Sequence, residues 1–152
     1  MEIGGKFATI KPMRVILDTN IFVGACIGAG AANRAVAACL QGQATPLMGT
    51  TLFNEYEDVL QRHKLFERSR LDVDERQSLL DIFIARCEWV RIYYAWRPNL
   101  HDEGDNHLIE LAIAGSAEMI VTRNLRDFRQ MELHFPHLRI CTPEDFLEEL
   151  QS

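Results

Sequence analysis

Short apolar segments recur along the chain, and their residues do not alternate with polar ones. They lie at residues 13–17, 46–49, 89–93, 119–122 and 138–141. A strand that is buried on both faces of a parallel sheet has this continuous apolar character, whereas a half-exposed strand alternates. The pattern therefore predicts five buried strands.

Helical patterns lie between these segments. Residues 31–40 are rich in alanine, and residues 52–60 carry an apolar stripe for which Thr51 is the candidate N-cap. Asp72, followed three residues later by Glu75, predicts a capping box for a third helix. A fourth helix is expected from Asp105 to Gly115, and a last one follows the cap at residue 142 and the proline after it. Strand and helix alternate, which predicts a doubly wound α/β fold with right-handed crossovers.

The size and composition indicate a single globular domain. The chain has 152 residues, 47% of them hydrophobic, which is enough to bury a core without disulfides. Residues 1–12 show no clear periodicity and are treated as a leader of uncertain status, so the predicted domain spans residues 13–150. The four cysteines have no metal-ligand spacing, which favours buried thiols in a reducing compartment. We expect a cytoplasmic protein with no membrane role.

The net charge of −6 argues against broad, non-specific binding of nucleic acid to a basic surface. Basic side chains do occur locally, and Arg123 and Arg126 flank the last of the acidic positions described below. These two arginines are candidates for contacting a phosphate, although exposed arginines are also common on ordinary surfaces.

Acidic residues follow the predicted strands. Asp18 comes directly after the first strand, Glu55 lies in the helix after the second, Asp127 follows the fourth, and Asp102 and Asp105 precede a helix. In a parallel α/β sheet, ligands bind outside the carboxyl ends of the strands, so these carboxylates are expected to meet there. Carboxylates that meet repel one another unless a cation lies among them, and oxygen ligands suit Mg²⁺ or Mn²⁺.

Each acid also has a structural interpretation. Asp18 could cap a helix that begins near Ile21, but Thr19 or Asn20 could serve as that cap, which favours a functional role for Asp18. Glu55 and Glu57 border the same apolar stripe on opposite sides; Glu55 lies nearer the strand and is preferred. Asp105 could cap its helix, and Asp127 could be an exposed acid in a turn. The five histidines have no tight ligand spacing, so surface or capping roles are expected for most of them.

Four motifs, taken in order, resemble those of PIN-domain ribonucleases, and in particular the VapC-like toxin components of toxin–antitoxin systems. They are Leu-Asp-Thr-Asn at residues 17–20, the helix that carries Glu55, the acidic segment 102–106 before its helix, and Val-Thr-Arg-Asn-Leu-Arg-Asp-Phe at residues 121–128. The resemblance implies a three-layer α/β/α sandwich with a central, mostly parallel sheet. It also implies Mg²⁺- or Mn²⁺-dependent cleavage of RNA.

The resemblance assigns roles to individual positions. Asp18, Glu55 and Asp105 match the first three acidic positions of the family, with Asp102 in support. The fourth is either Asp127 or Asn124, because many members carry an aspartate where this chain has Asn124. Two further polar positions, Asn20 and Thr122, match residues that orient the acids or the substrate.

Two other functions remain open at this stage. A phosphatase of the haloacid-dehalogenase type also has an aspartate after its first strand, but here Asn20 stands where its second aspartate belongs. A non-catalytic, partner-binding α/β domain would not need the acids. For the nuclease, the expected partners are RNA, an antitoxin protein and a second copy of the chain, with Trp96, Phe135 and Leu138 as candidate exposed apolar contacts.

Overall fold

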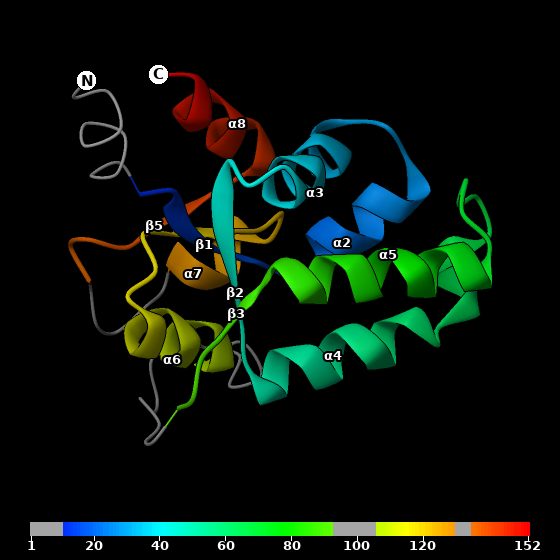
Figure 1. The fold of residues 1–152 in the computed structure, drawn as a ribbon, viewed down its shortest axis with the longest axis horizontal. Helices are drawn as coiled ribbons and strands as arrows, with labels where there is room; N and C mark the ends of the chain where they lie inside the picture. Colours follow the sequence, from blue (N-terminus) through cyan, green and yellow to red (C-terminus); the bar gives the residue numbers. More distant parts are fainter. Residues whose placement is uncertain (1–10, 93–105, 130–134) are drawn as a thin grey trace, which may run out of the picture.

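The structure is a computed structural model, and it describes residues 11–92, 106–129 and 135–152 (Figure 1). The elements follow in the order β1 (Met13–Leu17), α2 (Thr19–Ile27), α3 (Ala31–Leu40), β2 (Ala44–Met48), α4 (Thr50–Leu60), the 3₁₀ turn η1 (His63–Phe66), α5 (Val73–Arg86), β3 (Glu88–Trp89), α6 (Asn106–Gly115), β4 (Met119–Val121), α7 (Leu125–Arg129), β5 (Arg139–Cys141) and α8 (Pro143–Gln151). Strands and helices thus alternate as predicted.

The strands form one five-stranded sheet in the order β3-β2-β1-β4-β5, and every neighbouring pair is parallel. All five predicted strands are present. The strand β1 has the bounds of its apolar segment, and the ends of the other strands differ from those of their segments by at most four residues. The strand β3 is the shortest, and Tyr93, the last residue of the strand predicted there, lies outside the described residues.

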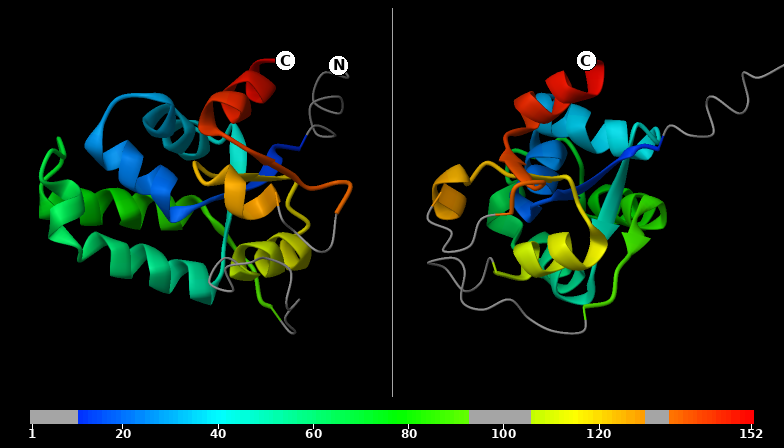
Figure 2. Two further views of the ribbon diagram at one scale, coloured as in Figure 1. Left: turned by 180° about the vertical axis from the view of Figure 1, so that it is seen from behind. Right: turned by 90° about the vertical axis from the view of Figure 1, so that its left-hand side faces the viewer.

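Helices cover both faces of the sheet (Figures 1 and 2). On one face, α3 and α5 lie against β2, and α3 also contacts α8. On the other face, α6 crosses β1, β2 and β4. This arrangement confirms the predicted three-layer α/β/α sandwich with a parallel central sheet.

Of the caps predicted for α4, α5 and α8, the structure confirms two. Asp72 accepts a hydrogen bond from the Glu75 amide while the Glu75 side chain accepts from the Asp72 amide, so the capping box of α5 is confirmed. The cap of α8 at residue 142, followed by proline, is also confirmed. The prediction that Thr51 caps α4 is wrong, because the N-cap is Gly49 and it has no side chain to offer. A Cβ at Gly49 would lie 3.3 Å from Leu111 in α6, so any side chain at this position would require Leu111 to shift.

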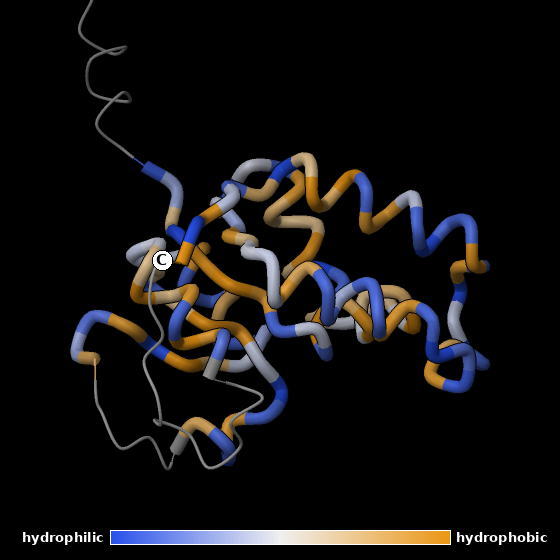
Figure 3. Tube along the Cα trace, turned by 90° about the horizontal axis from the view of Figure 1, so that it is seen from below, coloured by the Kyte–Doolittle hydropathy of each residue, from blue (hydrophilic) through white to orange (hydrophobic). Residues whose placement is uncertain are grey.

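The core is apolar and centred on the sheet. Figure 3 shows apolar segments running through the middle of the molecule, with polar residues alternating along the surrounding helices. The aromatic rings of Phe22, Tyr56 and Phe83 join α2, α4 and α5, and the last two stack with their centroids 5.9 Å apart. Of the candidate exposed apolar contacts, Phe135 and Leu138 are instead half-buried against this core, and Trp96 lies outside the described residues.

All four cysteines are free thiols, and all but the half-buried Cys87 are buried. Burial raises the pKa of Cys39 to about 12, which keeps this thiol protonated and unreactive. No single helix among the described residues is long and apolar enough to cross a membrane; α2 and α3 pass that test only as a pair, and the pair is bent by 106°.

Candidate functional site

The candidate site lies where the order of the strands reverses. From β1 the chain continues to β2 on one side, and β4 flanks β1 on the other. Leu17 and Val121, the last residues of β1 and β4, are in register, and the amide of Asp18 donates to the carbonyl of Val121 at 2.9 Å. Such a switch point at the carboxyl end of a parallel sheet is the usual place for a ligand.

Asp18 is buried at this point, with only 6% of its surface exposed. Its Oδ1 accepts from the Thr19 amide at 2.8 Å, and its Oδ2 accepts from the Thr122 hydroxyl at 2.8 Å and from the Asn20 amide group at 3.3 Å. Burial raises the pKa of Asp18; the bonds from Thr122 and Thr19 oppose this rise, and the nearby charge of Glu55 adds to it. The carboxylate is therefore held in one orientation, and no lysine or arginine is among its described hydrogen-bond donors.

Asp18 is also the N-cap of α2, and this corrects the earlier interpretation. The helix begins at Thr19 and not near Ile21, so neither Thr19 nor Asn20 is the cap. The capping bond uses Oδ1 alone, since it is Oδ1 that accepts from the Thr19 amide. An ionised carboxylate has about four lone-pair sites, so a cap can also serve as a ligand.

Glu55 faces Asp18 from α4. Its Oε1 accepts from the Thr19 hydroxyl at 3.3 Å, and the same hydroxyl is 3.5 Å from Oδ1 of Asp18, so one threonine links the two acids. Its Oε2 is 3.1 Å from Nε2 of His107, and this hydrogen bond is the largest of the causes that lower the pKa of Glu55. Glu57, the alternative on this helix, is exposed. The geometry therefore brings Glu55 to Asp18.

The loop after β4 completes the described part of the site. The Thr122 hydroxyl accepts from the Asn124 amide at 2.9 Å, and the Arg123 amide donates to the side chain of Asn20 at 3.2 Å. The side chain of Asn124 donates to Asp127 at 2.5 Å. Asn124 and Asp127 thus form one hydrogen-bonded unit, joined to Asp18 through Thr122.

The remaining predicted residues lie farther from the acids or outside the described part of the chain. The guanidinium of Arg123 forms an ion pair with Glu144 of α8 at 2.7 Å, and Arg126 is exposed. Asp102 and Asp105 belong to the segment 93–105, which the structure does not describe. Within the described residues no three histidine, cysteine, aspartate or glutamate side chains form a group that could hold a metal ion.

Two residues of the site were missed by the sequence reasoning. His107 is buried in α6, with 7% of its surface exposed, and does not take the surface or capping role expected of most histidines. The Tyr56 hydroxyl donates to the carbonyl of Leu17 at 2.6 Å, which fixes α4 next to the end of β1. His107 lies four residues before Leu111 on the buried side of α6, a spacing that could have indicated its burial.

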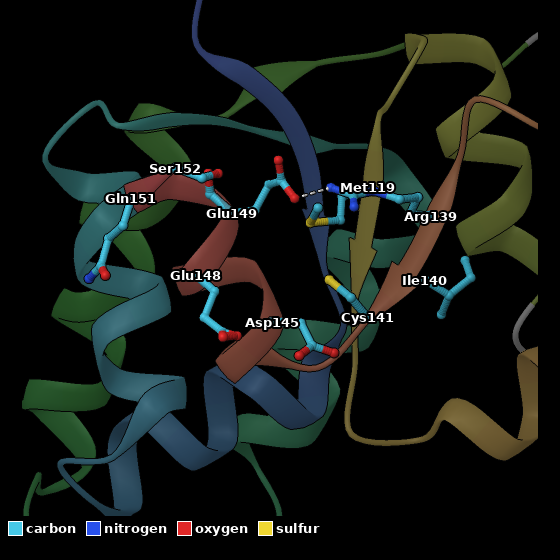
Figure 4. A pocket seen from close by; sticks show the side chains of 9 residues that line it. All are labelled: Met119, Arg139, Ile140, Cys141, Asp145, Glu148, Glu149, Gln151 and Ser152. Carbon is cyan, nitrogen blue, oxygen red and sulfur yellow. Dashed lines mark hydrogen bonds and ion pairs between the residues drawn. The ribbon is translucent and has the colours of Figure 1, made fainter.

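A separate pocket lies between β5 and α8 (Figure 4). It is lined by Arg139 and by the acidic side chains Asp145, Glu148 and Glu149, among others, and includes neither of the two acids of the site. Arg139 is already paired with Glu149 at 2.7 Å. This pocket therefore offers no unpaired cation for a phosphate and is not part of the candidate site.

Comparisons with known proteins place the chain in a family. The chain matches the family described as PIN domain over residues 14–126, well over half of its length. Among solved structures, it is similar to the crystal structure of VapBC2 from Rickettsia felis bound to a DNA fragment from their promoter, with a TM-score of 0.53 and 20% sequence identity over 84% of this chain and 97% of that one. At 20% sequence identity, the similarity to this solved structure shows a shared fold only. No match is found among curated proteins.

Proposed function

Because the chain belongs to the PIN domain family, we propose that it is a divalent-metal-dependent endoribonuclease that hydrolyses RNA phosphodiester bonds at the acidic site. One observation carries the proposal: a buried carboxylate, Asp18, is linked through Thr19 to a second acid, Glu55, at the switch point of the sheet. The charge of Glu55 raises the pKa of Asp18, so the two acids repel each other. A bound cation would relieve this repulsion.

The donor chemistry fits Mg²⁺ or Mn²⁺. Carboxylate oxygens are the hard ligands that these ions prefer, and the described hydrogen bonds to Asp18 and Glu55 come from hydroxyl, amide and imidazole groups, with no lysine or arginine among them. We propose that Asp18 and Glu55 hold the ion together with Asp105. Asp127, which Asn124 holds, would act at the edge of the site. The bound ion would supply a water of lowered pKa as the nucleophile at neutral pH.

The residues around the acids would then orient the reacting groups. Thr122 and Asn20 hold Oδ2 of Asp18, so that carboxylate needs little reorganisation. The side-chain oxygen of Asn20 also accepts from the Arg123 amide, so both ends of this amide group are engaged, and we assign it a positioning role. Arg126 is exposed beside this loop and is the proposed phosphate contact. Arg123 could join it only by leaving Glu144.

The reaction products test the proposal. With Mg²⁺ or Mn²⁺, the purified protein should cut single-stranded RNA to fragments with 5′-phosphate and 3′-hydroxyl ends, because an activated water attacks phosphorus, the bond to the 3′-oxygen breaks, and no 2′-hydroxyl takes part. EDTA or Asp18→Asn should abolish cleavage. Asp58→Asn is the matched control, since Asp58 lies on α4 but is exposed and paired with Arg62. Cyclic-phosphate ends, or cleavage that survives both EDTA and Asp18→Asn, would contradict the proposal.

We further propose that the protein is the toxin of a toxin–antitoxin pair. The support is the fold that it shares with VapBC2 of Rickettsia felis, which was solved bound to promoter DNA. Expression of the wild-type chain should arrest bacterial growth, and Asp18→Asn should not. Co-expression of a small protein encoded next to it should restore growth and copurify with it. Equal growth with wild type and Asp18→Asn would contradict a toxin role.

A further inference from the structure

His107 is built into the acidic site although it is not an acid. It lies at the second position of α6 and is 7% exposed, and its Nε2 is 3.1 Å from Oε2 of Glu55. The other oxygen of the same carboxylate accepts from the Thr19 hydroxyl at 3.3 Å. Among the described residues, each oxygen of Glu55 thus has one hydrogen-bond partner, and the two partners come from different elements, α6 and α2.

The chemistry of the contact sets the tautomer of the ring. An ionised carboxylate only accepts hydrogen bonds, so Nε2 of His107 must carry the hydrogen. The other ring nitrogen, Nδ1, is buried and has no hydrogen-bond partner among the described residues. Among the described residues, the ring therefore makes one hydrogen bond, which it donates to Glu55.

We propose that His107 is a positioning residue whose Nε2–H holds Glu55, so that Oε1 of that carboxylate is kept on the side of Asp18. The Glu55 side chain is about one third exposed and has several rotatable bonds, so it would sample other rotamers without this anchor. Mutation of a residue that hydrogen-bonds a metal-ligating side chain without touching the metal commonly lowers metal affinity or activity by about 10- to 100-fold. The inference rests on the proposed function, because it takes Glu55 as a metal ligand.

The first test needs no metal. In the metal-free protein, a long-range proton–nitrogen correlation spectrum of the imidazole rings should show His107 with hydrogen on Nε2. Glu55→Gln should shift the Nε2–H signal, while the ring of the exposed His63 should not change. A neutral ring with hydrogen on Nδ1 and none on Nε2 would overturn the proposal.

The second test compares two amides. His107→Gln places an amide nitrogen near the former position of Nε2, whereas His107→Asn is one methylene shorter and cannot reach Glu55. In calorimetric titrations, His107→Asn and His107→Leu should raise the Mn²⁺ dissociation constant at least tenfold, and His107→Gln should stay within threefold of wild type. His63→Gln is the matched control, and urea midpoints verify that each variant is folded. Equal losses in the Gln and Asn variants would indicate a merely structural histidine and overturn the proposal.

A double-variant cycle links the effect to Glu55. In the Glu55→Gln background, His107→Asn should weaken Mn²⁺ binding by less than twofold, because its partner is already changed. A full tenfold additional loss would show that His107 acts elsewhere. If the wild type bound no Mn²⁺ and cut no RNA, the proposed function would fail, and the tautomer in the metal-free protein would still decide whether His107 holds Glu55.

Discussion

Asp18→Asn removes the one acidic charge of the described site that is almost fully buried, so it should change stability in a way that depends on pH. Burial raises the pKa of Asp18 in the folded protein. Between the unfolded pKa, about 3.9, and the raised folded pKa, the folded chain binds more protons than the unfolded chain. Wild-type stability therefore falls as pH rises through this window, and the loss is complete above the folded pKa. Asparagine does not titrate, so the Asp18→Asn variant does not lose stability in this pH window.

The size of the effect follows from the contacts. A single titrating group changes the free energy of unfolding by at most about 1.4 kcal/mol per pH unit. Asparagine cannot accept at both former oxygens, where Asp18 accepts from Thr19 and Thr122, and a lost hydrogen bond costs about 1 kcal/mol. Protonated Asp18 also accepts less well at one oxygen, because a carboxyl hydroxyl is a weaker acceptor than a carboxylate oxygen. Below pH 4 the metal-free proteins should therefore differ by less than about 1 kcal/mol, and the variant should gain on wild type as pH rises to 7.

Urea unfolding in EDTA between pH 3.5 and 8 measures this difference. The matched control is Asp58→Asn, because Asp58 is exposed and an exposed ion pair contributes less than about 1 kcal/mol. Saturating Mn²⁺ at pH 7 should make wild type more stable than Asp18→Asn, the reverse of the order in EDTA. A ligand at 100 times its dissociation constant stabilises a protein by about 2.7 kcal/mol, and we expect only wild type to bind Mn²⁺ tightly.

Two results would refute the reasoning. A constant difference between Asp18→Asn and wild type over this pH range would mean that the charge of Asp18 is not disfavoured by folding. A disadvantage of the variant that grows with pH would mean that the bonds from Thr122 and Thr19 outweigh burial and lower the pKa instead. In either case the buried carboxylate would be a stabilising cap, and the repulsion that motivates a cation site would be absent.

Three further predictions follow from single contacts. Glu55→Gln should abolish RNA cleavage in initial-rate assays while Glu57→Gln keeps most of it, because only Glu55 contacts the Asp18 region; the reverse ranking would place the wrong face of α4 at the site. Tyr56→Phe should lower the free energy of unfolding by about 1–3 kcal/mol in urea, since it removes the hydrogen bond to a buried carbonyl of β1; an unchanged midpoint would show that the bond is not needed. Asp72→Ala should cost about 1 kcal/mol by loss of the capping box, and Asp72→Asn should restore most of it.

The fold could be predicted from the sequence because its signals are local. Continuous apolar segments mark the strands, and the side chains that cap α5 and α8 stand next to the backbone they bind. The start of α4 could not be predicted in this way. At Gly49, its N-cap, Leu111 of α6 and the carbonyl of Val90 lie within 3.5 Å of where a Cβ would stand, and Leu111 is 62 positions away along the chain. The preference of threonine for N-cap positions, on which the prediction for Thr51 rests, carries no information about that packing.

In the candidate site, too, the features set by local sequence could be predicted, and those set by packing between distant segments could not. The position of Asp18 after β1 is a local property and could be predicted, whereas its use as the N-cap depends on where α2 begins. The bond from His107 to Glu55 depends on how α6 lies against α4, and no local spacing specifies that angle. Tyr56 is similar, because its apolar neighbours predict burial but not the carbonyl that its hydroxyl reaches.

The donors around the two acids are mostly neutral, and this bears on what the site is for. A carboxylate that only supports the fold is commonly buried beside an arginine, since an unpaired buried charge is costly. Here Asp18 is held by hydroxyl and amide groups, and Arg123, the arginine of the adjoining loop, pairs with Glu144 instead. Neutral donors fix the direction of a carboxylate without cancelling its charge. This arrangement is what the proposed cation site requires, because the uncancelled charge would attract a cation from solution, at some cost in stability to the metal-free protein.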